Sequence, residues 1–270
     1  MQSADSGAVG LVEHHVAHRP GGDVAYVTIQ NPRRLNVLNT AVMIQLVEAF
    51  SRVVTNHALR AVVLTGAGPK AFVGGADIHE MVAIQSSSQA RAFITRVHHC
   101  CDAIRNCPVP VIARIQGYTF GAGLELAAAC DIRIAADSAT FGMPEVKLGI
   151  PSVVEAALLP MLVGWGRARE ILLLGESFSA RDALEWRLVE RVVSAASLDD
   201  AVETCVEQLM SSKPRAVHLQ KQLVRQWEDM SPSAAIQRGI DAFAAAFESD
   251  EPTVAMQEFL RAQAARKQQR

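Results

Sequence analysis

A glycine-rich segment that follows a short apolar strand is the feature that most constrains the fold of this chain. Residues 109–115 have strand character, and soon after them the sequence reads GYTFGAGLELAAAC. Gly117, Gly121 and Gly123 permit sharp backbone turns that a side chain would obstruct. Because the apolar run 124–130 is rich in helix formers, we predict that these glycines open a short helix.

The start of that helix offers free amide donors. Its first amides lack intrahelical partners and point outward at the positive end of the helix dipole, so they suit an oxygen atom that gains negative charge. Two acids flank the segment: Glu125 inside the apolar run, and Glu145 after Met143-Pro144. Glu125 is either a first-turn acid that complements the dipole or a catalytic group. Its apolar neighbours offer no polar face, and a buried acid is costly unless it is paired or used.

Composition indicates a globular protein with an ample core. The chain has 270 residues, of which 50% are hydrophobic and 20% charged, and its net charge is −2. This balance argues against a nucleic-acid binder, and no apolar run is long enough to cross a membrane. The N-terminus lacks the basic start and apolar stretch of a secretory signal, and its acidic residues disfavour a mitochondrial presequence. We therefore expect a cytoplasmic protein.

The five cysteines fit the same interpretation. Their number is odd and no CxxC spacing occurs, which is typical of reduced thiols in the cytoplasm. The run His98-His99-Cys100-Cys101 has the residue types of a metal site. However, adjacent residues on a helix point about 100° apart. We interpret the run as ordinary helix packing and expect no metal.

Strand, glycine-rich loop and helix recur along the chain with varying spacing, which indicates a layered α/β fold built from similar units. The expected strands are 24–29, 61–65, 109–115, 131–135 and 188–193. Residues 66–78 form a second glycine-rich loop, and from residue 197 only helical signals remain. We predict a core over residues 1–196 and a helical region over 197–270 that serves oligomerisation and covers the pocket.

Several catalytic signatures are absent from the sequence. It contains no GxSxG nucleophile elbow, no HExxH zinc motif after His79-Glu80 and no P-loop. Gly121-x-Gly123 after a strand has part of a dinucleotide-binding fingerprint, but Leu126 occupies the third glycine position. A dinucleotide-dependent oxidoreductase is therefore disfavoured.

Taken together, the motifs resemble the enoyl-CoA hydratase/isomerase (crotonase) superfamily. The matching segments follow the family's order over nearly the whole chain, at residues 31–38, 71–78, 117–125, 141–145, 180–193 and 212–214. The resemblance implies an α/β fold, a crotonase-like spiral of ββα units with a C-terminal all-helical segment. It also implies a homotrimer or a dimer of trimers.

The resemblance also assigns roles to positions of this chain. The backbone amides of Ala76 and Ala122 would form the oxyanion hole, with Glu125 and Glu145 as the catalytic acids. Arg33 or Arg34 would meet the CoA phosphates, while Asp77 and Ile78 would lie against the adenine. The remaining expected CoA and substrate contacts are Leu35, Gly75, Gly121 and Gly123.

The implied activity is reversible hydration of a 2-enoyl-CoA thioester without a metal or redox cofactor, coenzyme A entering as part of the substrate. We expect Glu125 to activate water, because a helix start favours its ionised form, and Glu145 to donate a proton through a raised pKa. Alternatives are a double-bond isomerase that uses mainly Glu145, a thioester hydrolase or a C–C lyase. Outside catalysis, the chain could be an acyl-CoA-binding subunit, although a binder has no need of paired acids.

One departure from the family affects substrate choice. Where the family has a glycine-rich turn after the second glutamate, this chain has Ser152-Val153-Val154-Glu155. The family pattern puts Ser152 and Glu155 near the acyl pocket. Glu155 is then either a helix-start acid that faces solvent, or a third acid that selects polar acyl chains. Two further departures, at Trp186-Arg187 and Val254–Met256, should affect packing more than chemistry.

Overall fold

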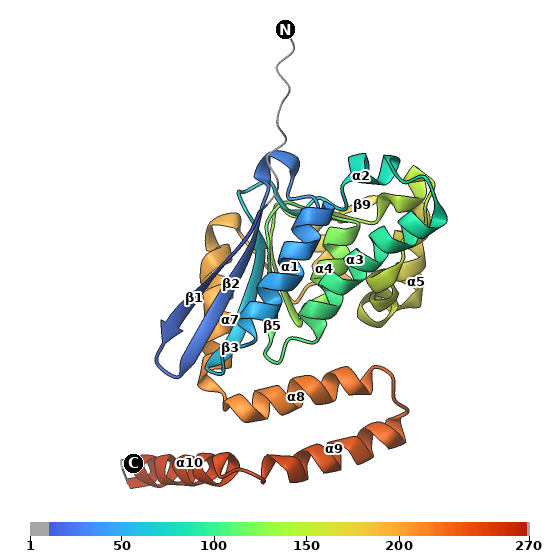
Figure 1. Cartoon of the computed structure of the whole chain (residues 1–270). Coiled ribbons are helices and arrows are strands. Elements are labelled where there is room, and N and C mark those ends of the chain that lie inside the picture. The colour runs from blue at the N-terminus through green and yellow to red at the C-terminus, as the bar shows by residue number, and fades with distance from the viewer. Residues whose placement is uncertain (1–10, 269–270) are drawn as a thin grey trace.

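A six-stranded sheet forms the frame of the chain in a computed structural model that describes residues 11–268 (Figure 1). The strand order is β1-β2-β3-β5-β7-β10, and all neighbours are parallel except β1 and β2. The strands are β1 (Leu11–Arg19), β2 (Gly22–Gln30), β3 (Leu59–Gly66), β5 (Val111–Ile115), β7 (Ile132–Ala136) and β10 (Arg191–Val193). The expectations for residues 1–10 lie outside the described residues.

Helices cover both faces of this sheet. Alternate side chains of the central strands face opposite ways, so Val62 and Leu64 join one core cluster while Ala61 and Val63 join a second. The first cluster includes α1 (Thr40–Val53), α3 (Ser87–Arg105) and α4 (Ala122–Ala129). The second cluster includes α7 (Leu198–Ser211), which packs on the opposite face.

A second sheet, of four very short strands, positions the functional segments. Its order is β4 (Ala71–Val73), β6 (Tyr118–Phe120), β8 (Thr140–Gly142) and β9 (Ser177–Ser179). The first three are parallel, and β9 is antiparallel to β8. The carboxyl ends of parallel neighbours meet at one edge. Three glycine- or proline-containing segments therefore meet there, at 74–76, 121–122 and 143–145.

Further helical elements complete the core. The remaining α-helices of this part of the chain are α2 (Ile78–Val82), α5 (Leu159–Leu174) and α6 (Ala180–Glu185). The 3₁₀ turns are η1 (Pro32–Arg34), η2 (Pro144–Leu148), η3 (Val154–Leu158) and η4 (Ala195–Ser197). Asn39 caps α1, and its side chain accepts a hydrogen bond from the Val42 amide at 2.8 Å. All five cysteines are buried and none forms a disulfide.

After α7 the described chain continues through α8 (Pro214–Trp227), α9 (Pro232–Ala246) and α10 (Glu251–Gln268). Figure 1 shows α9 running back along α8, with α10 far from the sheets. Because α7 packs on the large sheet, the helical region does not begin as a separate body at residue 197. The division of the chain at that residue stays a prediction. Within residues 11–268, no helix combines the length and apolarity that crossing a bilayer requires.

Candidate active site

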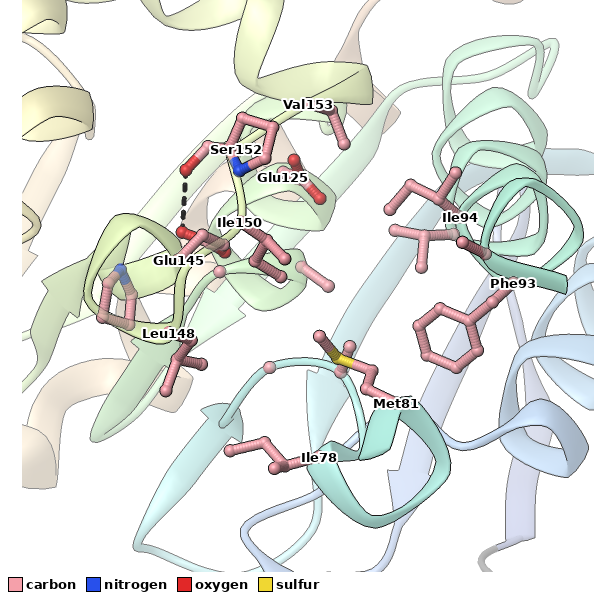
Figure 2. A pocket seen from close by; sticks show the side chains of 18 of the residues that line it. Ile78, Met81, Phe93, Ile94, Glu125, Glu145, Leu148, Ile150, Ser152 and Val153 are labelled. Atoms are coloured by element: carbon pink, nitrogen blue, oxygen red, sulfur yellow. Dashed lines mark hydrogen bonds between the residues drawn. The ribbon is translucent and has the colours of Figure 1, made fainter. Parts of the chain in front are cut away.

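One cavity, of about 660 Å³, opens at the shared edge of β4, β6 and β8. Of the predicted site residues, the cavity brings together Gly75, Ala76, Ile78, Gly121, Ala122, Glu125, Glu145 and Ser152. Figure 2 shows Glu125, Glu145 and Ser152 on one side of it, across from Met81, Phe93 and Ile94. Much of its lining is apolar and was not predicted, because those side chains come from α2, α3 and the chain after η2 and carry no motif.

Two residues that line this cavity have unpartnered amides. Leu38 donates to the Gly75 carbonyl at 2.8 Å and accepts from the Asp77 amide at 2.9 Å. These bonds fix the loop on both sides of Ala76 and leave its own N–H unused. Ala122 is the first residue of α4, where an amide has no intrahelical partner. Among residues 11–268 neither of the two amides donates a hydrogen bond, and both residues line the cavity. Their role as an oxyanion hole stays a prediction.

Two glycines allow these parts to come close together. Gly121 has φ +52°, and a Cβ there would lie 2.4 Å from Oε1 of Glu145. A Cβ on Gly123 would lie 2.1 Å from the carbonyl oxygen of Val73, so α4 touches β4 through this glycine. Gly123 itself does not line the cavity. Its place in the site is to permit the contact between helix and strand.

The two predicted acids have different surroundings. Glu145 lies partly buried in η2 and accepts a hydrogen bond from Oγ of Ser152 at 2.8 Å (Figure 2). Glu125 is only 4% exposed. Burial, and then the charges of Glu145 and Glu155, raise the pKa of Glu125 to about 8, although the Ala156 amide partly opposes this.

The surroundings of Glu125 act against the ionised form that a helix start favours. The opposing effect is desolvation among α3, α4 and η3, which the local sequence does not reveal. The division of roles between Glu125 and Glu145 stays a prediction.

Several of the predicted CoA contacts lie outside the cavity. Arg33 and Arg34 are exposed, and neither lines the cavity; nor do Leu35 and Asp77. Asp77 is 3% exposed, caps α2 by accepting from the His79 amide at 2.9 Å, and pairs with Arg34 at 3.2 Å. Its carboxylate thus holds the loop that carries Ala76. A contact between these residues and coenzyme A stays a prediction.

The expectation of a solvent-facing Glu155 is wrong. Glu155 is 7% exposed, in η3, and its Oε1 lies 2.8 Å from Nδ1 of His98 on α3. Its side chain does not line the cavity. No local pattern predicts this pair, since its members are 57 residues apart and meet only through packing. Among residues 11–268, no three His, Cys, Asp or Glu side chains gather as metal ligands.

Comparisons with known proteins agree with this geometry. A family model described as enoyl-CoA hydratase/isomerase matches residues 20–269, so the chain belongs to that family. It is 34% identical to a short-chain-enoyl-CoA hydratase of Clostridium acetobutylicum over 88% of this chain and 92% of the relative. It is also 34% identical to a crotonyl-CoA hydratase of Syntrophomonas wolfei, over 88% and 91% of the two chains.

Solved structures give the same result. The enoyl-CoA hydratase of Bacillus anthracis aligns with a TM-score of 0.86 and 31% identity, covering 94% of this chain and 97% of its own. That of Mycobacterium smegmatis aligns with a TM-score of 0.88 and 30% identity, with the same coverage. The predicted family, fold class and enzyme type, a hydro-lyase of the enoyl-CoA hydratase kind, are confirmed.

Proposed function

We propose that the chain adds water to short-chain 2-enoyl-CoA thioesters, using the amides of Ala76 and Ala122 and the carboxyls of Glu125 and Glu145. The observation that carries the proposal is that all four residues line one cavity at the carboxyl ends of β4, β6 and β8. The preference for short chains is supported by the names of two relatives, a short-chain-enoyl-CoA hydratase and a crotonyl-CoA hydratase.

The two amides act on the electrons of the conjugated thioester. When water oxygen bonds to C3, the π electrons move through C2 toward the thioester oxygen, which becomes an enolate oxygen. Two preorganised N–H donors stabilise that charge, and loss of one such donor typically costs about 3–4 kcal/mol. The enolate then collapses as C2 takes a proton, which gives the 3-hydroxyacyl-CoA.

The two glutamates supply and accept the protons. The reaction needs one carboxylate to take a proton from water and one carboxylic acid to give a proton to C2. Burial, and then the charge of Glu145, raise the pKa of Glu125 and so favour its protonated form. We therefore assign the proton donor to Glu125 and the base to Glu145, which Ser152 orients.

Loss of the conjugated thioester absorbance of crotonyl-CoA tests the proposal. Glu125→Gln and Glu145→Gln should each lower kcat by about 10²- to 10⁴-fold, since each removes one of the two proton-transfer groups. Glu48→Gln on α1, an exposed acid paired with Arg52, is the control and should leave kcat unchanged. Hydration at the wild-type rate in either site variant would refute the mechanism.

The same assay separates the alternatives. An isomerase would convert a 3-enoyl-CoA to the conjugated isomer and tolerate Glu125→Gln, because it needs mainly Glu145. A non-catalytic subunit would bind crotonyl-CoA without consuming it, and a hydrolase would release free thiol. The presence of both acids in one cavity favours the hydratase, because neither an acyl-CoA carrier nor a single-acid isomerase requires two.

We further propose that no metal or redox cofactor takes part and that coenzyme A enters only as part of the substrate. Activity should then survive dialysis against a chelator. We also propose a cytoplasmic enzyme that assembles as a homotrimer or a dimer of trimers. Support for assembly comes from exposed apolar side chains on α9 and α10, such as Ile240, Phe243 and Phe259.

A further inference from the structure

A third buried acid lies beside the catalytic pair without lining the cavity. Glu155 belongs to η3, which packs against both α3 and α4. Because α4 carries Glu125, the two acids belong to adjoining elements in direct contact. A buried carboxyl costs free energy unless it is paired or used.

Only one oxygen of the Glu155 carboxyl has a hydrogen-bond partner of normal geometry among the described residues. Oε1 is held by His98 at 2.8 Å, and the His98 side chain is 48% exposed. Oε2 is buried and lacks a hydrogen bond of normal geometry within residues 11–268, and the nearby donor is the Cys101 thiol, which is weak. A glutamate retained only to anchor α3 would leave no oxygen unsatisfied in a closed interior. The remaining effect of such a group is its charge, which acts over several ångströms in a medium of low dielectric constant.

The groups around Glu155 indicate where that charge acts. From α3 it faces His98, Cys100 and Cys101, and the thiols are buried, with their pKa values raised by burial first and by Glu155 next. From α4 it faces Glu125, which also feels Glu145 of η2. The charged residues of α5, which follows η3 directly, all come after Gly164: Arg167, Arg169 and Glu170. Glu125 is thus the one catalytic group with which Glu155 shares this interior among the described residues.

We propose that Glu155, held by His98, is a positioning residue that keeps the proton on Glu125. Its negative charge opposes the ionisation of Glu125, so that this carboxyl enters each turnover as the acid. His98, half exposed, holds the Glu155 carboxyl from the solvent side and thereby fixes it behind Glu125. The proposal rests on the hydratase mechanism above and adds a residue to it that touches no substrate.

The test is the pH dependence of kcat/KM for crotonyl-CoA, which reports the ionisation of the free enzyme. Activity falls at alkaline pH as Glu125 loses its proton. Glu155→Gln removes the neighbouring charge while keeping the size and an acceptor for His98, so the alkaline limb should move to lower pH by about one unit. Glu155→Leu, which also removes the unpartnered oxygen, should move it in the same direction. Glu155→Asp keeps the charge and should leave the limb near its wild-type position.

The outcomes are distinct. Equal shifts in Glu155→Asp and Glu155→Gln would assign Glu155 to packing and overturn the proposal, as would a wild-type limb in both Glu155→Gln and Glu155→Leu. Glu48→Gln, exposed and remote from η3, controls for a general change in charge and should show the wild-type profile. If the wild-type enzyme does not hydrate crotonyl-CoA at any pH, the hydratase mechanism itself fails. If the wild-type enzyme hydrates crotonyl-CoA and the alkaline limb does not move in the Glu155 variants, only the proposed role of Glu155 is refuted.

Discussion

At the scale of single residues, the protonation of Glu125 determines what the site can do. A carboxyl that is 4% exposed would ordinarily be avoided in a core, and here it is placed next to a second acid. Loss of hydration, and then repulsion by the charge of Glu145, favour the neutral form of Glu125. In the mechanism proposed above, two chemically identical side chains then supply the acid and the base that the addition of water requires.

This arrangement should affect stability as well as rate. The pKa of Glu125 rises from 4.5 to about 8 on folding, so the folded state binds its proton more tightly than the unfolded state does. The resulting stabilisation is complete below pH 4.5 and is lost as the pH rises through 8. Its size is on the order of a few kcal/mol.

Urea unfolding of the wild type and Glu125→Gln at pH 5, 7 and 9 measures this contribution. The free energy of unfolding of the wild type, relative to the variant, should decrease from pH 5 to pH 9, because glutamine cannot ionise. A difference that stays constant across this range would show that Glu125 does not change its protonation on folding.

At the scale of elements, the contact between α4 and β4 holds the two cavity amides in place. Ala76 follows β4 and Ala122 begins α4, so the separation of these elements sets the separation of the amides. Gly123 allows the contact because it has no Cβ to meet the Val73 carbonyl.

Gly123→Ala should therefore separate helix and strand. The added methyl group would lie 2.1 Å from the Val73 oxygen, and relief of that overlap should cost about 1–3 kcal/mol of stability and most of the hydratase activity. Gly166→Ala on α5 is the matched control, since a Cβ there meets nothing within 4 Å. Thermal unfolding and crotonyl-CoA hydration measure both effects. Equal behaviour of the two alanine variants would contradict the close contact.

Strands β2, β3, β5 and β7 of the large sheet were predictable because each has consecutive buried residues. Strand β1 was not among the expected strands, since none of residues 12–19 is fully buried. The strands of the small sheet were not predictable, because three residues are too few to show an alternating pattern. Residues 71–73 were instead taken as part of a loop. Their strand conformation depends on pairing with residues 118–119, which are distant in the sequence.

The features of the candidate site also differ in whether the sequence could predict them. The outward amides at the start of α4 follow from local sequence, because glycines before an apolar run predict a helix start. The assignment of Ala76 and Glu145 came from the family resemblance, since their loops carry no such pattern. The raised pKa of Glu125 and the His98–Glu155 pair were not predictable, because both result from packing of η3 against α3 and α4.

At the scale of the whole molecule, the last two helices expose more apolar surface than a lone chain should. Figure 1 shows α9 and α10 beyond α8, far from both sheets. Their exposed side chains include Ile236, Ile240, Phe243, Phe247 and Phe259. An apolar surface of this kind is typical of a surface that another chain covers. We infer that copies of this chain associate through α9 and α10.

Sedimentation equilibrium of the wild type should therefore give the mass of three or six chains. Phe243→Asp replaces a ring that is 71% exposed, and whose centroid lies 5.3 Å from that of Phe247, by a charge, so it should shift the assembly toward single chains. Gln237→Glu adds the same charge at an exposed polar position of α9 and should leave the mass unchanged. A wild type that sediments as one chain, or a Phe243→Asp variant of unchanged mass, would exclude this face as the interface. Because α9 and α10 lie far from the cavity within one chain, any cover they give to a substrate must come from a neighbouring copy, and the dissociated variant should then show a raised KM for crotonyl-CoA.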